Sequence, residues 1–446
     1  MNTTGSVARF GPVGFRIMAA LVAVGLWMFS GWMTLQADAP SGGRASRFRE
    51  PNALRSPVTA PGAVFRWFHD GQPIPLATNA TLVLGPFHPA QAGEYRVSVD
   101  SGQGPVLGDP AFLSLDPASP AQGGAVVAWG SGVAGIRRPP PAADTHVIAV
   151  SCGTGFALAL RLDGTVVAWG DSRLPVLQVP AAIQGRVHDV AAGASHAIAL
   201  LDDGTVAAWG KNDVGQTSIP PQIVGGIASV SAGFTTSAVL TVNGDVIYWG
   251  ALRPPAGVLY AGGVSPVVAV TQTISDRGNN LYAVDRNGGM RTGSASAWFS
   301  ISAPGLTNST STRWAGGNVL SLQSSGDIGY AIKALFAPEI PEDGAHGIVA
   351  IAAGRDHFLS LKSDGSAHAF GGNASRQSVV PEFVGTNAFG VAAGDELSFA
   401  VIRPTPVTLT ALPSDTQWIE GQPAFLRARG TGAPIRYKGT SKNHSI

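Results

Sequence analysis

Apolar residues lie along this chain in short runs between Gly-rich turns, and one such run recurs at a fixed spacing. The run ends in Trp-Gly, and its clearest copies carry Trp129, Trp169, Trp209 and Trp249, which lie 40 residues apart. A constant period of this size indicates stacked units of supersecondary structure. The pattern therefore predicts a repeat architecture, whatever the chemistry of the protein.

A second apolar run, which contains Ala-Gly, alternates with the Trp-Gly run. Its clearest copies are 190–200, 230–240 and 351–361, and the pair Asp203-Gly204 follows the first of them. Asp-Gly between two β-prone runs is a strong hairpin signal, and we expect both turn residues to have positive φ. Each unit is therefore predicted to contain an Ala-Gly strand, a tight turn and a Trp-Gly strand.

Weaker copies continue both patterns to residue 402. The turn recurs at Asn287-Gly288, Ser325-Gly326 and Asp364-Gly365, and the Trp position becomes Thr292, Ala331 and Phe370. The Ala-Gly runs lie near Ser151, Ala191, Ser231, Thr271, Trp314, Ala352 and Ala392. This gives seven runs of each kind, with a lone Trp-Gly run at 124–130 and a lone Ala-Gly run at 391–402. Pairing of these two runs would close the array into a ring without exposed sheet edges.

Both faces of the predicted Trp-Gly strands are apolar. In 165–169, Val166 and Ala168 point to one side, and Val167 and Trp169 point to the other. A half-solvated sheet would alternate with polar residues, whereas blades packed face to face bury both sides. The sequence therefore predicts an all-β fold: a seven-bladed β-propeller over 119–403, closed by pairing of its N- and C-terminal strands.

The repeat residues resemble those of the RCC1 (regulator of chromosome condensation) family. The matching positions are Ala192-Gly193, His196, Asp203-Gly204-Thr205-Val206, Trp209-Gly210 and Asn212-x-x-Gly215-Gln216. The resemblance covers 123–402 and is weak over 251–346. It implies a seven-bladed propeller and, as an activity, nucleotide exchange on a small GTPase. We find no counterpart of the family's exchange-specific insertion in this chain.

The segments on both sides of the array resemble immunoglobulin domains. In 40–118, a strand around Trp67 and a Gly-x-Tyr corner at Tyr95 resemble the I-set-like domains of bacterial surface proteins, with Val97 in place of the second Cys. In 404–446, the apolar runs resemble only the opening strands of such a domain. Half a sandwich cannot bury its apolar face, so we expect this segment to be a truncated piece of a longer protein.

Residues 1–39 have the pattern of an export signal. Arg9 and Arg16 precede an apolar stretch over 17–33, and 37–39 fits the small-x-small cleavage pattern. A cleaved signal peptide and an uncleaved membrane anchor are both compatible with the stretch, which is long for the first and short for the second. Both predict an exported protein that is secreted, periplasmic or anchored at the cell surface, in contact with the membrane only through this segment.

Composition and motifs narrow the range of functions. The net charge is +1 and charged residues make up 13% of the chain, which gives no electrostatic basis for binding nucleic acid. The single Cys excludes an internal disulfide. The chain contains no zinc-protease, nucleophile-elbow, P-loop or dinucleotide motif, so we expect no metal, no cofactor and no catalytic residue.

Some polar and aromatic residues recur with the repeat, and we expect them to be structural. His196 and His357 occupy the same position of two units, and each is expected to hydrogen-bond within its own blade. The Asp residues before Gly are expected to be turn residues; they are Asp163, Asp203 and Asp364. The four Trp residues of the repeat are expected to pack between blades rather than to bind a ligand.

Ligand contacts are expected where the repeat breaks down. The irregular segments 251–266, 293–313 and 332–347 all follow a Trp-type run, so they should emerge on one side of the ring. Insertions in repeat proteins tend to lie on a binding face. The candidate ligand contacts are Trp298, Phe299 and Phe336. The alternative role for these side chains is packing against outer strands.

Our leading hypothesis is a non-catalytic binding or adhesion module of an exported bacterial surface protein, whose propeller loops bind a protein or a glycan. A regulator with the nucleotide-exchange activity of RCC1 is the first alternative, which the export signal disfavours. A hydrolase or lyase in the central funnel is the second alternative. It would need convergent acids or histidines on the inner strands, where the sequence places Ala, Gly and Ser.

Overall fold

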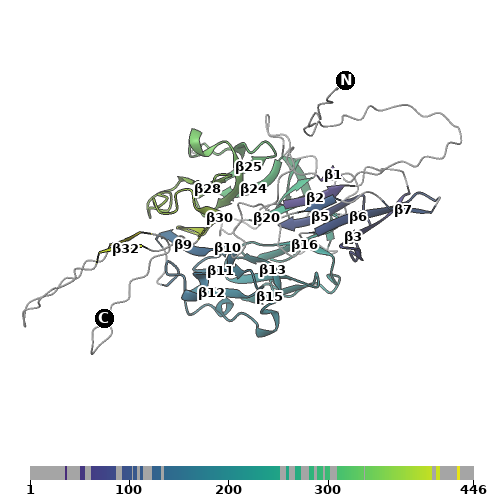
Figure 1. Ribbon diagram of the computed structural model, residues 1–446, viewed down its shortest axis with the longest axis horizontal. Helices are drawn as coiled ribbons and strands as arrows, with labels where there is room; N and C mark the ends of the chain where they lie inside the picture. The colour runs from purple at the N-terminus through teal and green to yellow at the C-terminus, as the bar shows by residue number, and fades with distance from the viewer. Residues whose placement is uncertain are drawn as a thin grey trace, which may run out of the picture. The chain divides into compact units, whose positions relative to one another are not determined.

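The computed structural model of the protein is almost entirely β-structure (Figure 1). It describes residues 36–37, 51–55, 62–86, 93–102, 104–107, 111–113, 123–131, 135–251, 258–260, 267–272, 281–285, 289–294, 297–301, 309–335, 337–403, 408–411 and 429–431. The predicted export signal lies outside these residues, apart from the two-residue strand β1 (Gln36–Ala37). Within the described ranges, no helix is long and apolar enough to span a membrane.

The described residues of 36–113 form two antiparallel sheets ahead of the repeats, and we call this part the N-terminal domain. One sheet contains β1, β2 (Pro51–Arg55) and β5 (Thr81–Pro86); the other contains β3 (Val64–His69), β4 (Gln72–Pro73), β6 (Gly93–Asp100), β7 (Pro105–Leu107) and β8 (Ala111–Leu113). Trp67 and Tyr95 are buried in its core, and the Trp67 indole N–H donates to the Asn79 carbonyl at 2.8 Å. The likeness of 40–118 to an immunoglobulin domain stays a prediction.

Seven antiparallel sheets follow in the described part of 125–402. Six are continuous in sequence: β10 (Val147–Cys152), β11 (Phe156–Arg161) and β12 (Val166–Gly170); β13 (Val187–Ala192), β14 (His196–Leu201) and β15 (Val206–Gly210); β16 (Ile227–Ala232), β17 (Thr236–Thr241), β18 (Val246–Gly250) and β19 (Val258–Tyr260); β20 (Val267–Gln272), β21 (Leu281–Asp285), β22 (Met290–Ser294) and β23 (Ala297–Ile301); β24 (Ser309–Ala315), β25 (Asn318–Gln323) and β26 (Ile328–Ile332); β27 (Ile348–Ala353), β28 (His357–Lys362) and β29 (Ala367–Gly371). The seventh joins β30 (Ala388–Ala393) and β31 (Leu397–Ile402) to β9 (Ala125–Gly130). Short 3-10 helices in the connections are Pro141–Ala143, Pro175–Leu177, Ala181–Ile183 and Glu342–Gly344.

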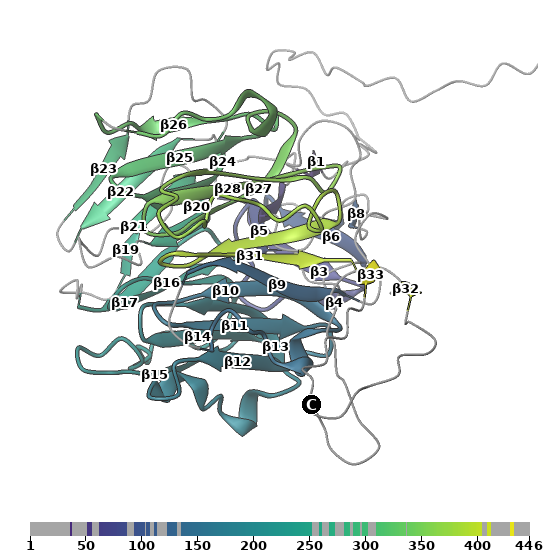
Figure 2. The same ribbon diagram turned by 90° about the vertical axis from the view of Figure 1, so that its left-hand side faces the viewer.

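The pairing of β9 with β31 closes the array. Ala125 pairs with Ile402 and Gly130 with Leu397, in an unbroken antiparallel register. Figure 2 shows β9 alongside β31. The first strands of successive sheets are in contact from β10 through β13, β16, β20, β24 and β27 to β30, and β30 contacts β10 in turn. The predicted pairing of the two lone runs is therefore confirmed.

The Ala-Gly run is two strands rather than the single strand that we predicted. Gly193 lies in the turn between β13 and β14, so each unit contributes three strands. A Cβ atom on Gly193 would lie 2.3 Å from Cε1 of the His196 ring and 2.6 Å from the Gly233 carbonyl oxygen of the next sheet. Real Cβ atoms never approach that closely, so this turn requires Gly.

The Asp-Gly turn also differs from the two-residue turn that we predicted. Gly204 has a φ of +75°, but Asp203 is not among the residues with positive φ. Instead, the Asp203 carboxylate accepts from the backbone N–H of Thr205 at 2.9 Å, and the Gly204 N–H donates to the Leu201 carbonyl at 3.0 Å. This is a longer loop that ends in a left-handed Gly, and the Asp side chain holds it.

A last pair of strands follows the array. These strands are β32 (Thr408–Ala411) and β33 (Arg429–Thr431), and they are antiparallel. The rest of 404–446 lies outside the described residues, so the truncated immunoglobulin segment stays a prediction, as do the domain boundaries.

Candidate functional site

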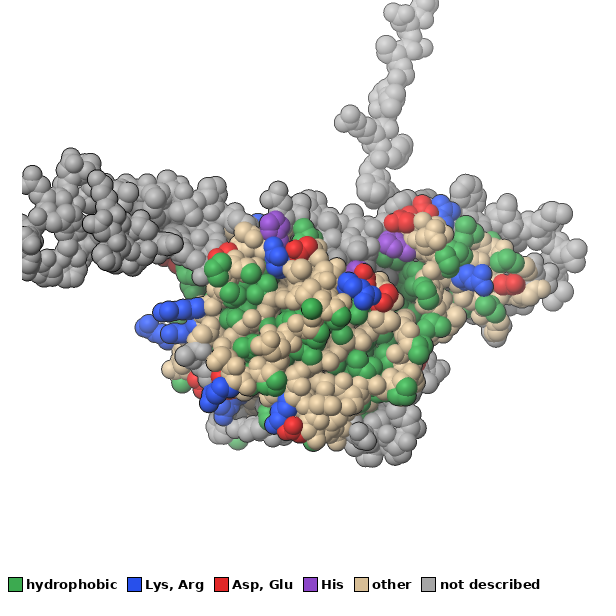
Figure 3. Space-filling model, turned by 90° about the horizontal axis from the view of Figure 1, so that it is seen from below, with side chains coloured by type: hydrophobic (Ala, Val, Ile, Leu, Met, Phe, Trp, Pro, Cys, Tyr) green, Lys and Arg blue, Asp and Glu red, His purple; other side chains and the backbone are tan. Residues whose placement is uncertain are grey.

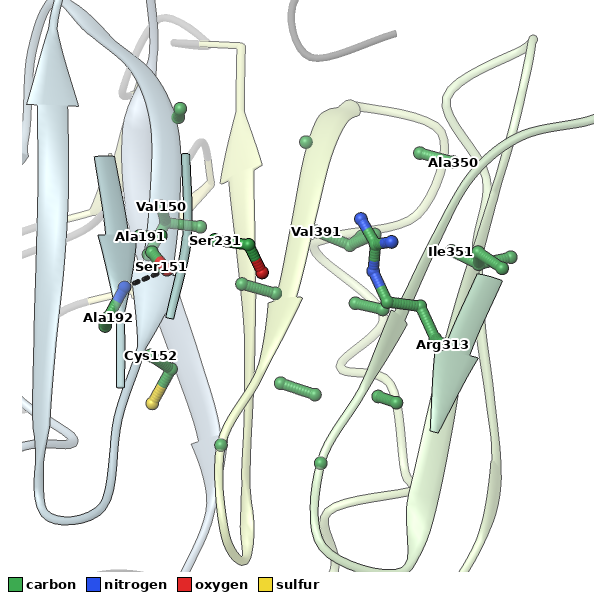
Figure 4. Close-up of a pocket in the computed structure, with 18 of the residues that line it drawn as sticks. Val150, Ser151, Cys152, Ala191, Ala192, Ser231, Arg313, Ala350, Ile351 and Val391 are labelled. Atoms are coloured by element: carbon green, nitrogen blue, oxygen red, sulfur yellow. Dashed lines mark hydrogen bonds between the residues drawn. The ribbon is translucent and has the colours of Figure 1, made fainter. Parts of the chain in front are cut away.

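The first strands of the sheets enclose a central cavity of about 250 Å³ (Figure 4). All seven first strands carry a β-bulge after their first residue. The cavity wall includes alternate residues beyond the bulge, such as Asp189 and Ala191 on β13 and Ser229 and Ser231 on β16. A bulge re-aims the side chains that follow it, so this repeated feature sets which residues face the cavity.

The cavity is lined mostly by small and apolar residues, with four charged residues among them: Asp189, Arg313, Arg355 and Asp395. Asp189 lies on β13 and is buried, and Arg313 lies on β24, where Figure 4 shows its guanidinium at the cavity wall. Arg313 Nη1 donates to Ser311 Oγ at 3.0 Å and to the Thr312 carbonyl at 2.7 Å. The expectation that these positions hold only Ala, Gly and Ser was therefore wrong, because the bulges were not foreseen and the unit around β24 departs from the repeat.

Other polar groups of the wall hold the sheets together. Ser151 Oγ on β10 accepts from the Ala192 N–H on β13 at 3.0 Å, the contact dashed in Figure 4. Cys152 is buried at the end of β10, its Sγ lies 3.4 Å from the Phe156 carbonyl oxygen, and burial raises the pKa of its thiol. A protonated, buried thiol packs as a small apolar side chain and is a poor nucleophile.

The two buried histidines bridge neighbouring sheets, which corrects our prediction that each bonds within its own blade. His196 Nε2 on β14 lies 3.0 Å from Ser237 Oγ on β17, and His357 Nε2 on β28 lies 2.9 Å from Ser398 Oγ on β31. All four side chains are fully buried. The prediction failed because the serine partner lies 41 residues further along the chain, in the next unit.

Each serine also donates a hydrogen bond, and this fixes the imidazole tautomer. Ser237 Oγ donates to the Gln216 carbonyl at 2.7 Å, and Ser398 Oγ donates to the Gln377 carbonyl at 2.8 Å. The hydroxyl oxygen must then accept from the Nε2–H of its histidine. Burial lowers the pKa of both imidazoles to about 4. Both histidines are therefore neutral structural groups at neutral pH.

The four repeat tryptophans are buried, as predicted, and none is more than 7% exposed. Three of them donate their indole N–H to a backbone carbonyl: Trp129 to Gln377 at 3.0 Å, Trp169 to Ile136 at 2.8 Å and Trp209 to Val176 at 2.8 Å. The Trp249 indole N–H has no partner among the described residues. These side chains pack and tie loops to the sheets, so they are not a stacking platform for a ligand.

The structure describes the backbone of two of the three predicted ligand contacts. Trp298 and Phe299 lie on β23, the outer strand of its sheet, paired with Gly293 and Thr292. The segment 293–313 is therefore not a purely irregular loop, since it contains β23 and the start of β24. Phe336 lies outside the described residues, and the ligand-binding role of all three stays a prediction.

Several charged groups on the surface lie in small clusters of mixed sign. The face in Figure 3 shows basic and acidic side chains next to each other between apolar and neutral ones. One such cluster joins Arg186 to Asp202 at 3.2 Å and to Asp203 at 2.6 Å. Among the described residues, no group of three or more His, Cys, Asp or Glu side chains could hold a metal ion.

A closed array of antiparallel sheets around a central cavity defines the class of protein: an all-β propeller built from sequence repeats. The regulator of chromosome condensation (RCC1) repeat matches residues 147–173, 187–216 and 348–377. The chain therefore contains RCC1 repeats, and the resemblance seen in the sequence is confirmed over these three segments. No curated protein matches the chain.

Solved structures support the same fold. Prp20p from Saccharomyces cerevisiae, in a study of its binding to Gsp1p and histones, is similar with a TM-score of 0.50 and 16% identity, over 64% of this chain and 92% of that one. Yeast RCC1 (Prp20) in complex with Kap60 is similar with a TM-score of 0.50 and 16% identity, over 64% of this chain and 90% of that one. At this identity the similarity shows the fold alone.

Proposed function

We propose that this chain is a non-catalytic binding module in which an RCC1-type, seven-bladed propeller presents its loops and central cavity to a protein or glycan partner. The observation that carries the proposal is the structural use of the polar residues that the repeat encodes. His196 and His357 bridge sheets, and Asp203 closes a turn. Because these repeated residues are used in structural contacts, we expect the residues that vary between units to bind the partner.

A protein partner has additional support from the relatives. The solved structures that resemble this fold are of proteins described with protein partners, namely Gsp1p and histones in one case and Kap60 in the other. We carry over only the use of a propeller as a protein-binding surface. The export pattern of 1–39 and the immunoglobulin-like pattern of 40–118 favour a partner at the cell surface or in the envelope.

Nucleotide exchange on a small GTPase is the alternative that the RCC1 resemblance implies. The two functions differ in a measurement that uses the full chain. The binding module should show saturable binding to immobilised glycans or envelope proteins, and the paired change Trp298→Ala with Phe299→Ala should weaken it without lowering the melting temperature. Catalytic release of a fluorescent guanine nucleotide from small GTPases, without saturable binding to either partner class, would contradict the proposal.

A further inference from the structure

One hairpin turn of the propeller is hydrogen-bonded to the N-terminal domain. It carries Asn243, between β17 and β18. Asn243 Nδ2 donates to the Leu76 carbonyl at 2.9 Å, and Asn243 Oδ1 accepts from the Thr78 N–H at 3.1 Å. Asn79 Nδ2 donates to the Asn243 carbonyl at 2.9 Å. One side chain and its backbone carbonyl thus make three hydrogen bonds to the segment between β4 and β5.

Apolar packing surrounds these hydrogen bonds. The Val83 N–H on β5 donates to the Val242 carbonyl at 2.9 Å, which brings the backbone of the N-terminal domain against the turn. Val83 and Val242 are both buried, and they belong to one continuous apolar cluster with Trp67 of the N-terminal domain and Leu240 of β17. The same cluster includes Val267 and Leu281 of the β20–β23 sheet, so the contact joins the core of the N-terminal domain to two neighbouring propeller sheets, with the hydrogen bonds made by the β16–β19 sheet.

The equivalent turns of other sheets cannot make the same contact. Asp163, Asp203 and Asp364 use their carboxylates to accept from an N–H of their own turn, at 3.1, 2.9 and 2.8 Å respectively. A carboxylate also has no hydrogen to donate to the Leu76 carbonyl, whereas an amide donates and accepts at once. In the Asn243 turn, Thr241 Oγ1 takes over the local role by accepting from the Asp245 N–H at 3.0 Å, which leaves the Asn243 amide for the N-terminal domain.

A second residue makes room for the contact. Gly226 precedes β16, and a Cβ atom there would lie 3.2 Å from Cβ of Leu76. The β10 and β13 sheets have His146 and Arg186 at this position, where a side chain would crowd Leu76, whereas the β27 sheet has Gly347 but carries Asp364 rather than Asn in its turn. Leu76 itself has a φ of +63°, a conformation that non-Gly residues hold only where surrounding contacts enforce it.

We infer that Asn243 and Gly226 select the β16–β19 sheet as the docking site of the N-terminal domain, whose segment 74–83 is the partner, so that the domain and the propeller form one rigid body. This docking does not depend on the proposed binding function of the propeller. Asn243 stands where the described turns of other sheets have Asp163, Asp203 and Asp364, and docking gives this change of residue a function.

The test uses the full chain and hydrogen–deuterium exchange of the segment 74–83. Asn243→Asp keeps a turn that Asp forms elsewhere in this chain, removes the donor to the Leu76 carbonyl and places a carboxylate beside it. We expect exchange in 74–83 to become at least about tenfold faster, while β11 and β14 stay protected. The matched control is Asp364→Asn, the reverse exchange of the same two side chains in a turn of the β27–β29 sheet, and it should leave exchange in 74–83 unchanged.

A second variant keeps the proposal testable if Asn243→Asp does not fold. Gly226→Arg introduces the residue that precedes β13 and should also release the segment 74–83. Exchange of 74–83 that is unchanged in the folded Asn243→Asp and Gly226→Arg variants would overturn the proposal. An equal acceleration in Asp364→Asn would also overturn it, because docking would then not depend on this turn.

Discussion

The hydrogen bond from His357 to Ser398 allows a sharp test of how the sheets are joined. Ser398→Ala removes the acceptor of the His357 Nε2–H, which lies 2.9 Å away in a site with no solvent exposure. The Gln377 carbonyl loses the Ser398 donor but keeps the Trp129 indole N–H at 3.0 Å. The main loss is therefore one unsatisfied, buried imidazole N–H, which costs about 1–3 kcal/mol of the free energy of unfolding.

The chain itself provides the compensating change. In the first sheet, Phe156 occupies the position of His357, and Ala197 of the next sheet occupies the position of Ser398. Phe156 approaches Gly153 as closely as His357 approaches Gly354, since a Cβ on either glycine would lie 2.2 Å from the ring. The double variant His357→Phe with Ser398→Ala reproduces that native pair without a buried polar group. We expect it to cost less than about 1.5 kcal/mol, as a conservative change of a buried side chain does.

Urea unfolding of the wild type, both single variants and the double variant at pH 7.5 completes the cycle. We expect a coupling free energy of about 1–3 kcal/mol, with the double variant more stable than Ser398→Ala alone. The same cycle on His196 and Ser237 should give the same sign. Single effects that add to within about 0.5 kcal/mol would refute the reasoning, because the pair would then have no interaction to lose.

Three further predictions follow from buried groups. Burial lowers the pKa of the two bridging histidines from 6.5 to about 4, so the unfolded chain binds protons at a higher pH than the folded chain does. The free energy of unfolding is therefore at its full value above pH 6.5 and falls by about 3 kcal/mol per histidine as the pH drops to 4. Urea midpoints, compared with those of a variant in which both histidines are replaced by Phe, measure this loss. Gly354→Ala should lower the melting temperature strongly, since its Cβ would lie 2.2 Å from the Gly394 carbonyl oxygen, whereas Gly390→Ala meets only Val401 at 3.4 Å and should be nearly neutral. Trp209→Phe removes the donor to the Val176 carbonyl, whereas the indole N–H of Trp249 has no partner among the described residues. In urea unfolding, Trp209→Phe should therefore lower the free energy of unfolding by about 1–2 kcal/mol more than Trp249→Phe does.

The sequence was sufficient to predict the Trp-Gly strands and the closure of the array, because both depend on local chemistry that recurs, but it merged the two strands of each Ala-Gly run into one. The Trp-Gly and Ala-Gly runs mark the strands of each sheet, and the unpaired runs at the two ends predicted the pairing of β9 with β31. Even the degenerate positions Thr292, Ala331 and Phe370 lie on the strands where the pattern placed them. Repetition compensates for weak individual signals, since every unit must solve the same packing problem.

Contacts between units were not predictable in the same way. The serine partners of His196 and His357 lie one unit ahead, a relation that a single repeat does not display. The inward direction of Asp189 and Arg313 depends on a bulge in the first strand, which shifts the alternation of faces. Asn243 occupies the Asp position of an Asp-Gly turn, and nothing in the repeat itself indicates that the N-terminal domain lies against it.

Closure of the ring by β9 and β31 is the central claim, and hydrogen–deuterium exchange of the full chain tests it most directly. The backbone amides of Ala125–Gly130 pair with Leu397–Ile402, a strand more than 260 residues away in sequence. If the ring is closed, β9 should exchange within about threefold of β11, which lies in a sheet that is continuous in sequence. Exchange of β9 that is a hundredfold or more faster than that of β11 would contradict the closed ring.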